Sequence, residues 1–213
     1  MKMILCRHAE TDFNKEKRLQ GWMETSINEK GQKQAQLLSL ALKDEEFDYV
    51  FSSPQKRCMQ TAREIMKFHK NEIIFQDELR EINIGKYAGM DKQEIEQKFP
   101  GDWKKRVEDK YGFVHEGGES YAQVDEKRVK PLLAAFREKY SSRKILVITH
   151  QGTARLIIGN MLGLGPLEKM DLDCPNDCIY YIEYLPHKTT VKYSLVQSGK
   201  STEGYLTKHR EIV

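Results

Sequence analysis

The sequence has no long hydrophobic run and no large segment of a single character. Its longest apolar stretch, Ala154 to Leu167, is interrupted by Arg155 and three glycines and is too short to cross a bilayer. Only the short segment Met3 to Cys6 precedes Arg7, so we expect neither a signal-peptide core nor a membrane span at the start. These absences indicate a cytoplasmic protein with no membrane partner.

A strong charge excess is also lacking. The chain has 35 Lys and Arg against 32 Asp and Glu, and its formal net charge is +3. Nucleic-acid binders normally carry a basic stripe or arm, so we expect no nucleic-acid partner. Hydrophobic residues make up 39% and charged residues 31% of the 213 residues, which is typical of a globular protein with a charged surface.

Cysteine is scarce, with four residues scattered along a chain long enough to build its own core. Reduced thiols are therefore the expected state. Cys174 and Cys178 lie four residues apart, but no second Cys or His pair at ligand spacing completes a metal site. We expect no metal and no cofactor.

Apolar runs and helical repeats alternate along the chain and predict an α/β fold. The expected strands are 2–6, 49–52, 72–75 and 144–149, followed by β-rich segments at 178–184 and 190–196. The expected helices are 28–43, a helix capped by Ser53-Pro54 that runs to about Phe68, 120–140 and 152–161. This order predicts one domain over 1–213, with a single doubly wound, mostly parallel sheet flanked by helices.

Two segments do not fit that alternation. The polar stretch at about 88–118 contains several glycines and one expected helix, Asp91 to Phe99, and we interpret it as a helical cap insertion over one end of the sheet. The tail from Ser198 to Val213 is polar, and we expect it to be loosely held.

Two histidines follow predicted strands directly. His8, beside Arg7, comes after the first strand, and His150 ends the strongest one, so both should lie at the carboxyl edge of the sheet, where α/β proteins bind ligands. Arg57 lies one turn inside the helix that follows Ser53 and could reach the same edge; its alternative is a solvated helix arginine. Glu81 has apolar neighbours and needs a partner if buried; an ion pair with a nearby arginine is the alternative.

Six ordered blocks resemble the histidine phosphatase superfamily, the phosphoglycerate-mutase-like proteins, over nearly the whole chain. The blocks are Arg7-His8-Ala9-Glu10-Thr11 with Asn14, Gln20-Gly21-Trp22, Asn28-Glu29-Lys30-Gly31, Ser52-Ser53 with Arg57 and Gln60-Thr61-Ala62, Leu79-Arg80-Glu81-Ile82 with Gly85, and Thr149-His150-Gln151-Gly152. The resemblance implies metal-independent phosphoryl transfer through a phosphohistidine. Two positions depart from the family pattern, because Ala9 and Gln151 stand where most members have glycine.

The resemblance also implies roles for individual residues. His8 would be the nucleophile and Glu81 the general acid and base. Cationic and neutral donors suit the transferred phosphoryl group, whose transition state needs positioning and charge neutralisation. The oxygens would be held by Arg7, Arg57 and His150, with Asn14 as a neutral donor and Gln20, Gly21 and Gln151 at the border of the phosphate pocket.

The residues after Glu81 favour a phosphatase over a mutase. Mutases that resemble this chain have a basic residue and a tyrosine there, whereas this chain has Ile82, Asn83 and Ile84. A cofactor-dependent phosphoglycerate mutase is the runner-up, and a non-catalytic phospholigand-binding protein is the second alternative.

The cap insertion is expected to determine the choice of substrate. Its aromatic residues could contact a substrate or anchor the cap, and its basic residues could favour a small acidic phosphomonoester or form a solvated face. These residues are Trp103, Tyr111 and Phe113, and Lys104, Lys105, Arg106 and Lys110. A sugar phosphate, phosphoserine, a phosphoglycerate and a cobalamin precursor stay open as substrates, as does a homodimer.

Overall fold

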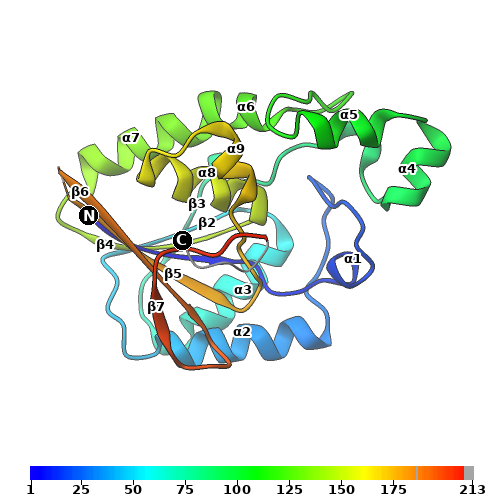
Figure 1. The fold of residues 1–213 in the computed structure, drawn as a ribbon. Helices are drawn as coiled ribbons and strands as arrows, with labels where there is room; N and C mark the ends of the chain where they lie inside the picture. The colour runs from blue at the N-terminus through cyan, green and yellow to red at the C-terminus, as the bar shows by residue number, and fades with distance from the viewer. Residues whose placement is uncertain (186, 209–213) are drawn as a thin grey trace.

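A computed structural model describes residues 1–185 and 187–208 and has three layers (Figure 1). The middle layer is a seven-stranded sheet in the order β3-β2-β4-β1-β5-β6-β7. Helices cover both of its faces. The segment predicted as a cap insertion, with α4 (Lys92–Lys98) and α5 (Asp102–Glu108), extends beyond one end of the sheet. The predicted doubly wound α/β fold is confirmed.

The core of the sheet is parallel and its far side is antiparallel. Strands β1 (Lys2–Arg7), β2 (Tyr49–Ser52), β3 (Ile73–Phe75) and β4 (Lys144–Thr149) run in one direction. Strands β5 (Cys178–Leu185), β6 (Lys188–Leu195) and β7 (Ser201–Glu203) extend the sheet as antiparallel neighbours. Residues of β1 and β4 are paired from Lys2 with Lys144 to Arg7 with Thr149, so His8 and His150 leave the sheet side by side.

Alternate side chains of the central strands enter two cores. Ile4 and Leu146 face helices α2 (Glu29–Leu42) and α3 (Lys56–Ile65). Leu5 and Val147 face the opposite layer, where α7 (Lys130–Lys139) and α8 (Gln151–Leu162) pack. Burial on both faces explains why these strands read as continuous apolar runs.

The remaining helical segments are short. They are α1 (Asp12–Lys15), the 3₁₀ turns Met66–Phe68, Asp77–Leu79 and Gly85–Tyr87, α4 (Lys92–Lys98), α5 (Asp102–Glu108), α6 (Tyr121–Val124) and α9 (Pro166–Asp171). The helix expected at 120–140 does begin at this point, at Tyr121, with Ser120 as the cap residue whose side chain accepts from the backbone N–H of Gln123. A π-helical turn at Asp125–Val129 separates α6 from α7, which the sequence pattern did not predict.

The predicted start of α3 is wrong. Ser53 does not cap a helix that begins at Pro54; the cap residue is Gln55 and the helix begins at Lys56. The Ser53 hydroxyl accepts from the backbone N–H of Gln55 at 3.3 Å and also lies 2.9 Å from Nε2 of His150. A side chain that is well placed for capping is used here for a tertiary contact.

The prediction of a loosely held tail is wrong for the part that the structure describes. Residues 201–203 form the edge strand β7, and Leu206 is buried, its N–H donating to the Tyr180 hydroxyl. The Lys208 N–H donates to the carbonyl of Asp171. Residues 209–213 lie outside the described residues.

Helix α2 fixes the loop that follows His8. The side chain of Asn28 caps the helix by accepting from the N–H of Gly31, and the Asn28 N–H donates to the carbonyl of Glu10. A Cβ atom on Gly31 would lie 2.1 Å from that carbonyl oxygen. This contact explains why glycine occupies position 31, because the loop after His8 packs directly against the start of the helix.

We therefore expect Gly31→Ala to destabilise the protein, by roughly 2 kcal/mol, because the added methyl group must displace backbone. Elsewhere in a helix the same change stabilises by up to about 1 kcal/mol, so the sign is diagnostic. Urea unfolding measures it, with the exposed Lys33→Ala on the same helix as a control that should change stability little. An increase in stability for Gly31→Ala would contradict the contact.

Candidate active site

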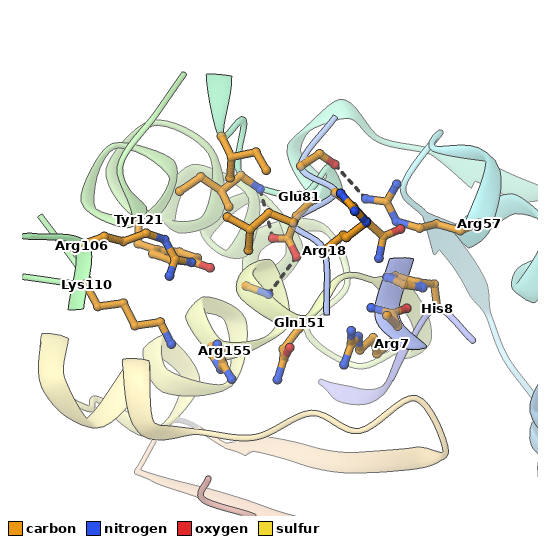
Figure 2. Close-up of a pocket in the computed structure, with 17 residues that line it drawn as sticks. Arg7, His8, Arg18, Arg57, Glu81, Arg106, Lys110, Tyr121, Gln151 and Arg155 are labelled. Atoms are coloured by element: carbon orange, nitrogen blue, oxygen red, sulfur yellow. Dashed lines mark hydrogen bonds between the residues drawn. The ribbon is translucent and has the colours of Figure 1, made fainter. Parts of the chain in front are cut away.

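A cavity of about 280 Å³ opens at the carboxyl ends of β1 and β4 (Figure 2). Its walls combine cationic, amide and apolar side chains around one carboxylate. They are Arg7, His8, Asn14, Arg18, Leu19, Gln20, Gly21, Arg57, Glu81, Ile82, Ile84, Arg106, Lys110, Tyr121, Gln151, Gly152 and Arg155.

His8 lies at one end of this cavity and is 2% exposed. Its ring Nδ1 lies 2.8 Å from the carbonyl oxygen of Ala9, which can only accept, so Nδ1 carries the proton and donates it. Burial and the guanidinium groups of Arg57 and Arg7 hold the pKa of His8 well below its ordinary value. The imidazole is therefore neutral, and Nε2 has the free electron pair.

Two arginines flank His8. Arg57 is fully buried, so the alternative of a solvated helix arginine is wrong; its terminal nitrogens donate to the carbonyls of Gly21 and Met23, each at 2.8 Å. Each of these nitrogens has a second hydrogen, and the guanidinium also lines the cavity. Arg7 donates to the carbonyl of Cys174, and its buried Nε has no hydrogen-bond partner within the described residues. An unpaired buried donor fits an anionic ligand.

His150 lies behind His8 rather than in the cavity wall. Its ring centre is 5.2 Å from that of His8, and it is fully buried. Nδ1 accepts from Nε of Arg57 at 3.2 Å, so Nε2 carries the proton and donates to the hydroxyl of Ser53. Burial, together with Arg57, holds the pKa of His150 well below its ordinary value.

Glu81 lies near the middle of the cavity (Figure 2). Its carboxylate accepts from the backbone N–H of Ile82 at 3.0 Å and of Gly152 at 3.1 Å. Gly152 is in the first turn of α8, where the helix dipole favours a negative charge. A Cβ atom at Gly152 would lie 2.4 Å from Oε1 of Glu81, so only glycine permits this approach.

Gln55 is a positioning residue that the sequence did not reveal. It is fully buried; its amide nitrogen donates to the carbonyl of Gly21, and its amide oxygen accepts from the N–H of Glu81. The indole N–H of Trp22 donates to the carbonyl of Glu81 at 2.7 Å. Gln55 therefore ties the Gly21 loop to the backbone of the carboxylate. In the sequence, only its position between Ser53 and Arg57 could have indicated this role.

The amide residues predicted at the pocket border all line the cavity. The side-chain oxygen Oδ1 of Asn14 accepts from the backbone N–H of Thr11, which leaves the side-chain NH₂ group to face a ligand. Gln20 accepts from Thr25, and Gln151 donates to Asp173 at 2.9 Å. Gly21 has a φ of +50°, and a Cβ there would lie 2.5 Å from Ile84, which explains the glycine.

The aromatic residues of the cap anchor it and do not line the cavity. The Tyr111 hydroxyl donates to Asp125 and Phe113 packs against Tyr87 and His115, whereas Trp103 stacks on the guanidinium of Arg106 within its own helix. The apolar wall is formed instead by other side chains. These are Leu19, Ile82, Ile84 and Tyr121.

The basic residues of the cap divide into two groups. Lys104 and Lys105 are exposed and pair with Glu108 and Asp102. Arg106 and Lys110 line the cavity, together with Arg155 of α8. Sequence reasoning missed Arg155, although its place five residues after His150 on one helix was a signal.

The cysteines do not build a site. All four are buried free thiols, as predicted. Over residues 1–185 and 187–208 there is no group of three or more His, Cys, Asp or Glu side chains placed to hold a metal ion. No helix in this part of the chain is long and apolar enough to span a membrane.

The arrangement can bind a phosphoryl group and react with it. A neutral imidazole nitrogen suits nucleophilic attack, the guanidinium groups suit phosphoryl oxygens, and a carboxyl group nearby can move a proton. These groups come from three separated segments that β1, α3 and the loop before Ile82 bring to one cavity.

Comparisons with known proteins agree with this geometry. The family model of the histidine phosphatase superfamily (branch 1) matches residues 3–195 of this chain. Phosphoserine phosphatase 1 of Hydrogenobacter thermophilus is 32% identical over 212 residues, covering 100% of both chains. The metal-independent phosphoserine phosphatase of Arabidopsis thaliana is 32% identical over 73% of this chain and 66% of its own length.

The solved structures share the fold. The alpha-ribazole phosphatase from Shigella flexneri superposes with a TM-score of 0.82 at 23% identity, over 100% of this chain and 98% of its own. The predicted family and the predicted phosphatase class are confirmed by these matches together.

The neutral state of His8 predicts a pH dependence of stability. Because the pKa of His8 is lowered in the folded protein, the unfolded chain binds the extra proton as the pH falls below about 6.5. Between pH 7.5 and 5.5 this should cost on the order of 1 kcal/mol of unfolding free energy for His8. Urea unfolding at both pH values measures it.

The matched control is His8→Gln, which keeps a neutral polar side chain but has no imidazole. We expect the variant to lose less unfolding free energy on acidification than the wild type, and the difference is the contribution of His8. Equal losses in the two proteins would mean that folding does not lower the pKa of His8.

Proposed function

The chain belongs to the histidine phosphatase superfamily, and we propose that it hydrolyses phosphomonoesters through a phosphohistidine on His8, without a metal ion or cofactor. One observation carries the proposal: the hydrogen bond from Nδ1 of His8 to the Ala9 carbonyl leaves a neutral Nε2 in a cavity flanked by Arg7 and Arg57. Independence from metal is supported by the similarity to the metal-independent phosphoserine phosphatase of Arabidopsis thaliana.

In the first step Nε2 of His8 attacks the phosphorus atom. The N–P bond forms, the ester P–O bond breaks, and the leaving oxygen takes a proton from the carboxyl group of Glu81. Arg7 and Arg57 neutralise the charge on the phosphoryl oxygens, and the NH₂ group of Asn14 is a further donor.

In the second step a water molecule restores the enzyme. The Glu81 carboxylate takes a proton from the water, whose oxygen attacks the phosphorus as the N–P bond to His8 breaks. Inorganic phosphate is released, and Nε2 of His8 regains its electron pair. Gln55 and Gly152 hold Glu81 in place for both proton transfers.

We assign His150 a positioning role in this reaction. It contacts the His8 ring and accepts from Arg57, so it orients the nucleophile and one phosphate ligand. The direct contact with a phosphoryl oxygen that the resemblance implies requires His150 to give up its bond to Ser53. Gln20, Gly21 and Gln151 border the phosphoryl site.

The proposed substrate is a small acidic phosphometabolite, handled in the cytoplasm. The cavity of about 280 Å³ and its cationic lining support that class, as does the name of the Hydrogenobacter relative, a phosphoserine phosphatase. Ile82 and Ile84, which follow Glu81, present apolar groups to the cavity and favour hydrolysis over the mutase alternative.

The test is turnover after treatment with a chelator. We expect phosphate release from p-nitrophenyl phosphate and phosphoserine, a loss of about 10³-fold or more in His8→Ala, and a loss of about 10²- to 10⁴-fold in kcat for Glu81→Gln. Free phosphate and 2-phosphoglycerate are scored separately when 3-phosphoglycerate is supplied.

Isomerisation of 3-phosphoglycerate without net phosphate release would favour the mutase instead. Tight phosphoester binding with no product that depends on His8 would mean a binding protein. A requirement for added metal ion would contradict the metal-independent mechanism.

A further inference from the structure

Three cationic side chains lie at the end of the cavity away from His8. Arg106 comes from α5, Lys110 follows that helix, and Arg155 comes from the second turn of α8 (Figure 2). Glu81 lies between this group and the His8 end. We call Arg106, Lys110 and Arg155 the distal cations.

Protein groups satisfy the distal cations only in part. Nε of Arg106 donates to Nε2 of His115 at 3.3 Å, and its terminal nitrogens contact no acceptor among the described residues. The amino group of Lys110 is 3.4 Å from the carbonyl of Met170. Arg155 donates to the carbonyl of Leu172, and its guanidinium is 3.9 Å from the carboxylate of Asp173.

Positive charge at this end is costly without a ligand. Burial, with Arg155 and Lys208 nearby, lowers the pKa of Lys110 to about 5. Buried charges are normally paired, and an anion among like charges favours their charged form. The distal cations therefore surround a position that an anion would stabilise.

The charge balance of the whole cavity indicates how much negative charge is missing. Arg18 is neutralised by a two-point contact with Glu94 and does not count. The other cationic side chains of the lining are Arg7, Arg57, Arg106, Lys110 and Arg155. Among the described residues, the carboxylates that face them are Glu81 and Asp173.

Three positive charges therefore remain when Lys110 is protonated. A phosphomonoester brings a charge of about −2 at neutral pH, which is held at the His8 end. With Glu81 ionised, one further negative charge completes the balance. With Glu81 protonated, as the first step of the proposed reaction requires, the positive excess is larger by one, so a carboxylate on the substrate reduces the excess in both states.

We propose that Arg106, Lys110 and Arg155 form a second anion site that binds a carboxylate on the phosphomonoester substrate. The proposal rests on the proposed function, which places the phosphoryl group at His8. It makes this enzyme selective for phosphorylated small carboxylic acids over the corresponding phosphorylated alcohols. His115, which accepts from Arg106 and is itself held by the carbonyl of Glu119, positions the site.

Selectivity follows from the cost of leaving the distal cations unpaired. A substrate without the carboxylate buries the same phosphoryl group but leaves these charges uncompensated, which lowers its kcat/KM. A substrate with the carboxylate is held at both ends, with its ester oxygen near Glu81. We expect this selectivity to depend on the cationic residues that line the cavity, and not on the total positive charge of the cap.

The experiment compares substrates that differ in one group. 3-Phosphoglycerate and glycerol 3-phosphate share the phosphoryl end and differ in the carboxylate, as do phosphoserine and phosphoethanolamine. For the wild type at physiological salt, we expect kcat/KM to be about tenfold or more higher for the carboxylate-bearing compound of each pair than for its partner compound. Arg106→Gln and Lys110→Met should each reduce that ratio by about tenfold.

The control variant is Lys104→Met, which removes a charge from the same helix as Arg106 but outside the cavity. We expect it to keep the wild-type ratio, which separates a local contact from long-range attraction. Arg155 is left intact because its bond to the Leu172 carbonyl supports the fold.

Two results would overturn the second anion site while the proposed function stands. In one, the wild type hydrolyses both members of each pair equally well. In the other, the ratio does not change in Arg106→Gln and Lys110→Met, or falls as much in Lys104→Met. A wild type that releases no phosphate from any of the four compounds contradicts the proposed function itself.

Discussion

The hydrogen bond from Nδ1 of His8 to the carbonyl of Ala9 decides which ring nitrogen can react, and the rest of the site depends on it. The bond fixes the tautomer, and burial beside Arg57 and Arg7 keeps the ring neutral. The loop that carries it is held by pairing of β1 with β4 and by the contact of Gly31 with Glu10. In the proposed mechanism this neutral ring nitrogen is the nucleophile, and the backbone at the end of β1 determines which nitrogen it is.

The distribution of charge in the cavity follows from the same arrangement. Glu81 is held by backbone N–H groups and by no arginine in the described residues, so the cations that line the cavity stay available for a ligand. In the proposed mechanism a phosphomonoester at the His8 end contacts Arg7 and Arg57. The distal cations need a second negative charge. Because Arg106 and Lys110 belong to the cap, we propose that the cap selects substrates that carry this charge.

Much of this could be predicted from the sequence because it depends on local pattern. The apolar run of β4 and the helical repeat of α2 predicted those elements nearly to the residue, and the order of elements placed His8 beside His150. Ser53 shows where local pattern fails: its hydroxyl does bond the backbone N–H of Gln55, but it also bonds His150, which is distant in sequence. The roles of Gln55 and Arg155, and the inward direction of Arg106 but not Lys104, depend on tertiary packing that spacing does not encode.

Covalent trapping tests the central claim most directly. Glu81→Gln is mixed with p-nitrophenyl phosphate, whose leaving group needs little help from an acid, then unfolded at alkaline pH and analysed by mass spectrometry of the intact chain and its peptides. The account predicts one acid-labile phosphoryl group per chain, on His8, since the variant lacks the carboxylate that activates water. Release of p-nitrophenol with no phosphoryl group on the chain, or a phosphoryl group on another residue, would contradict it.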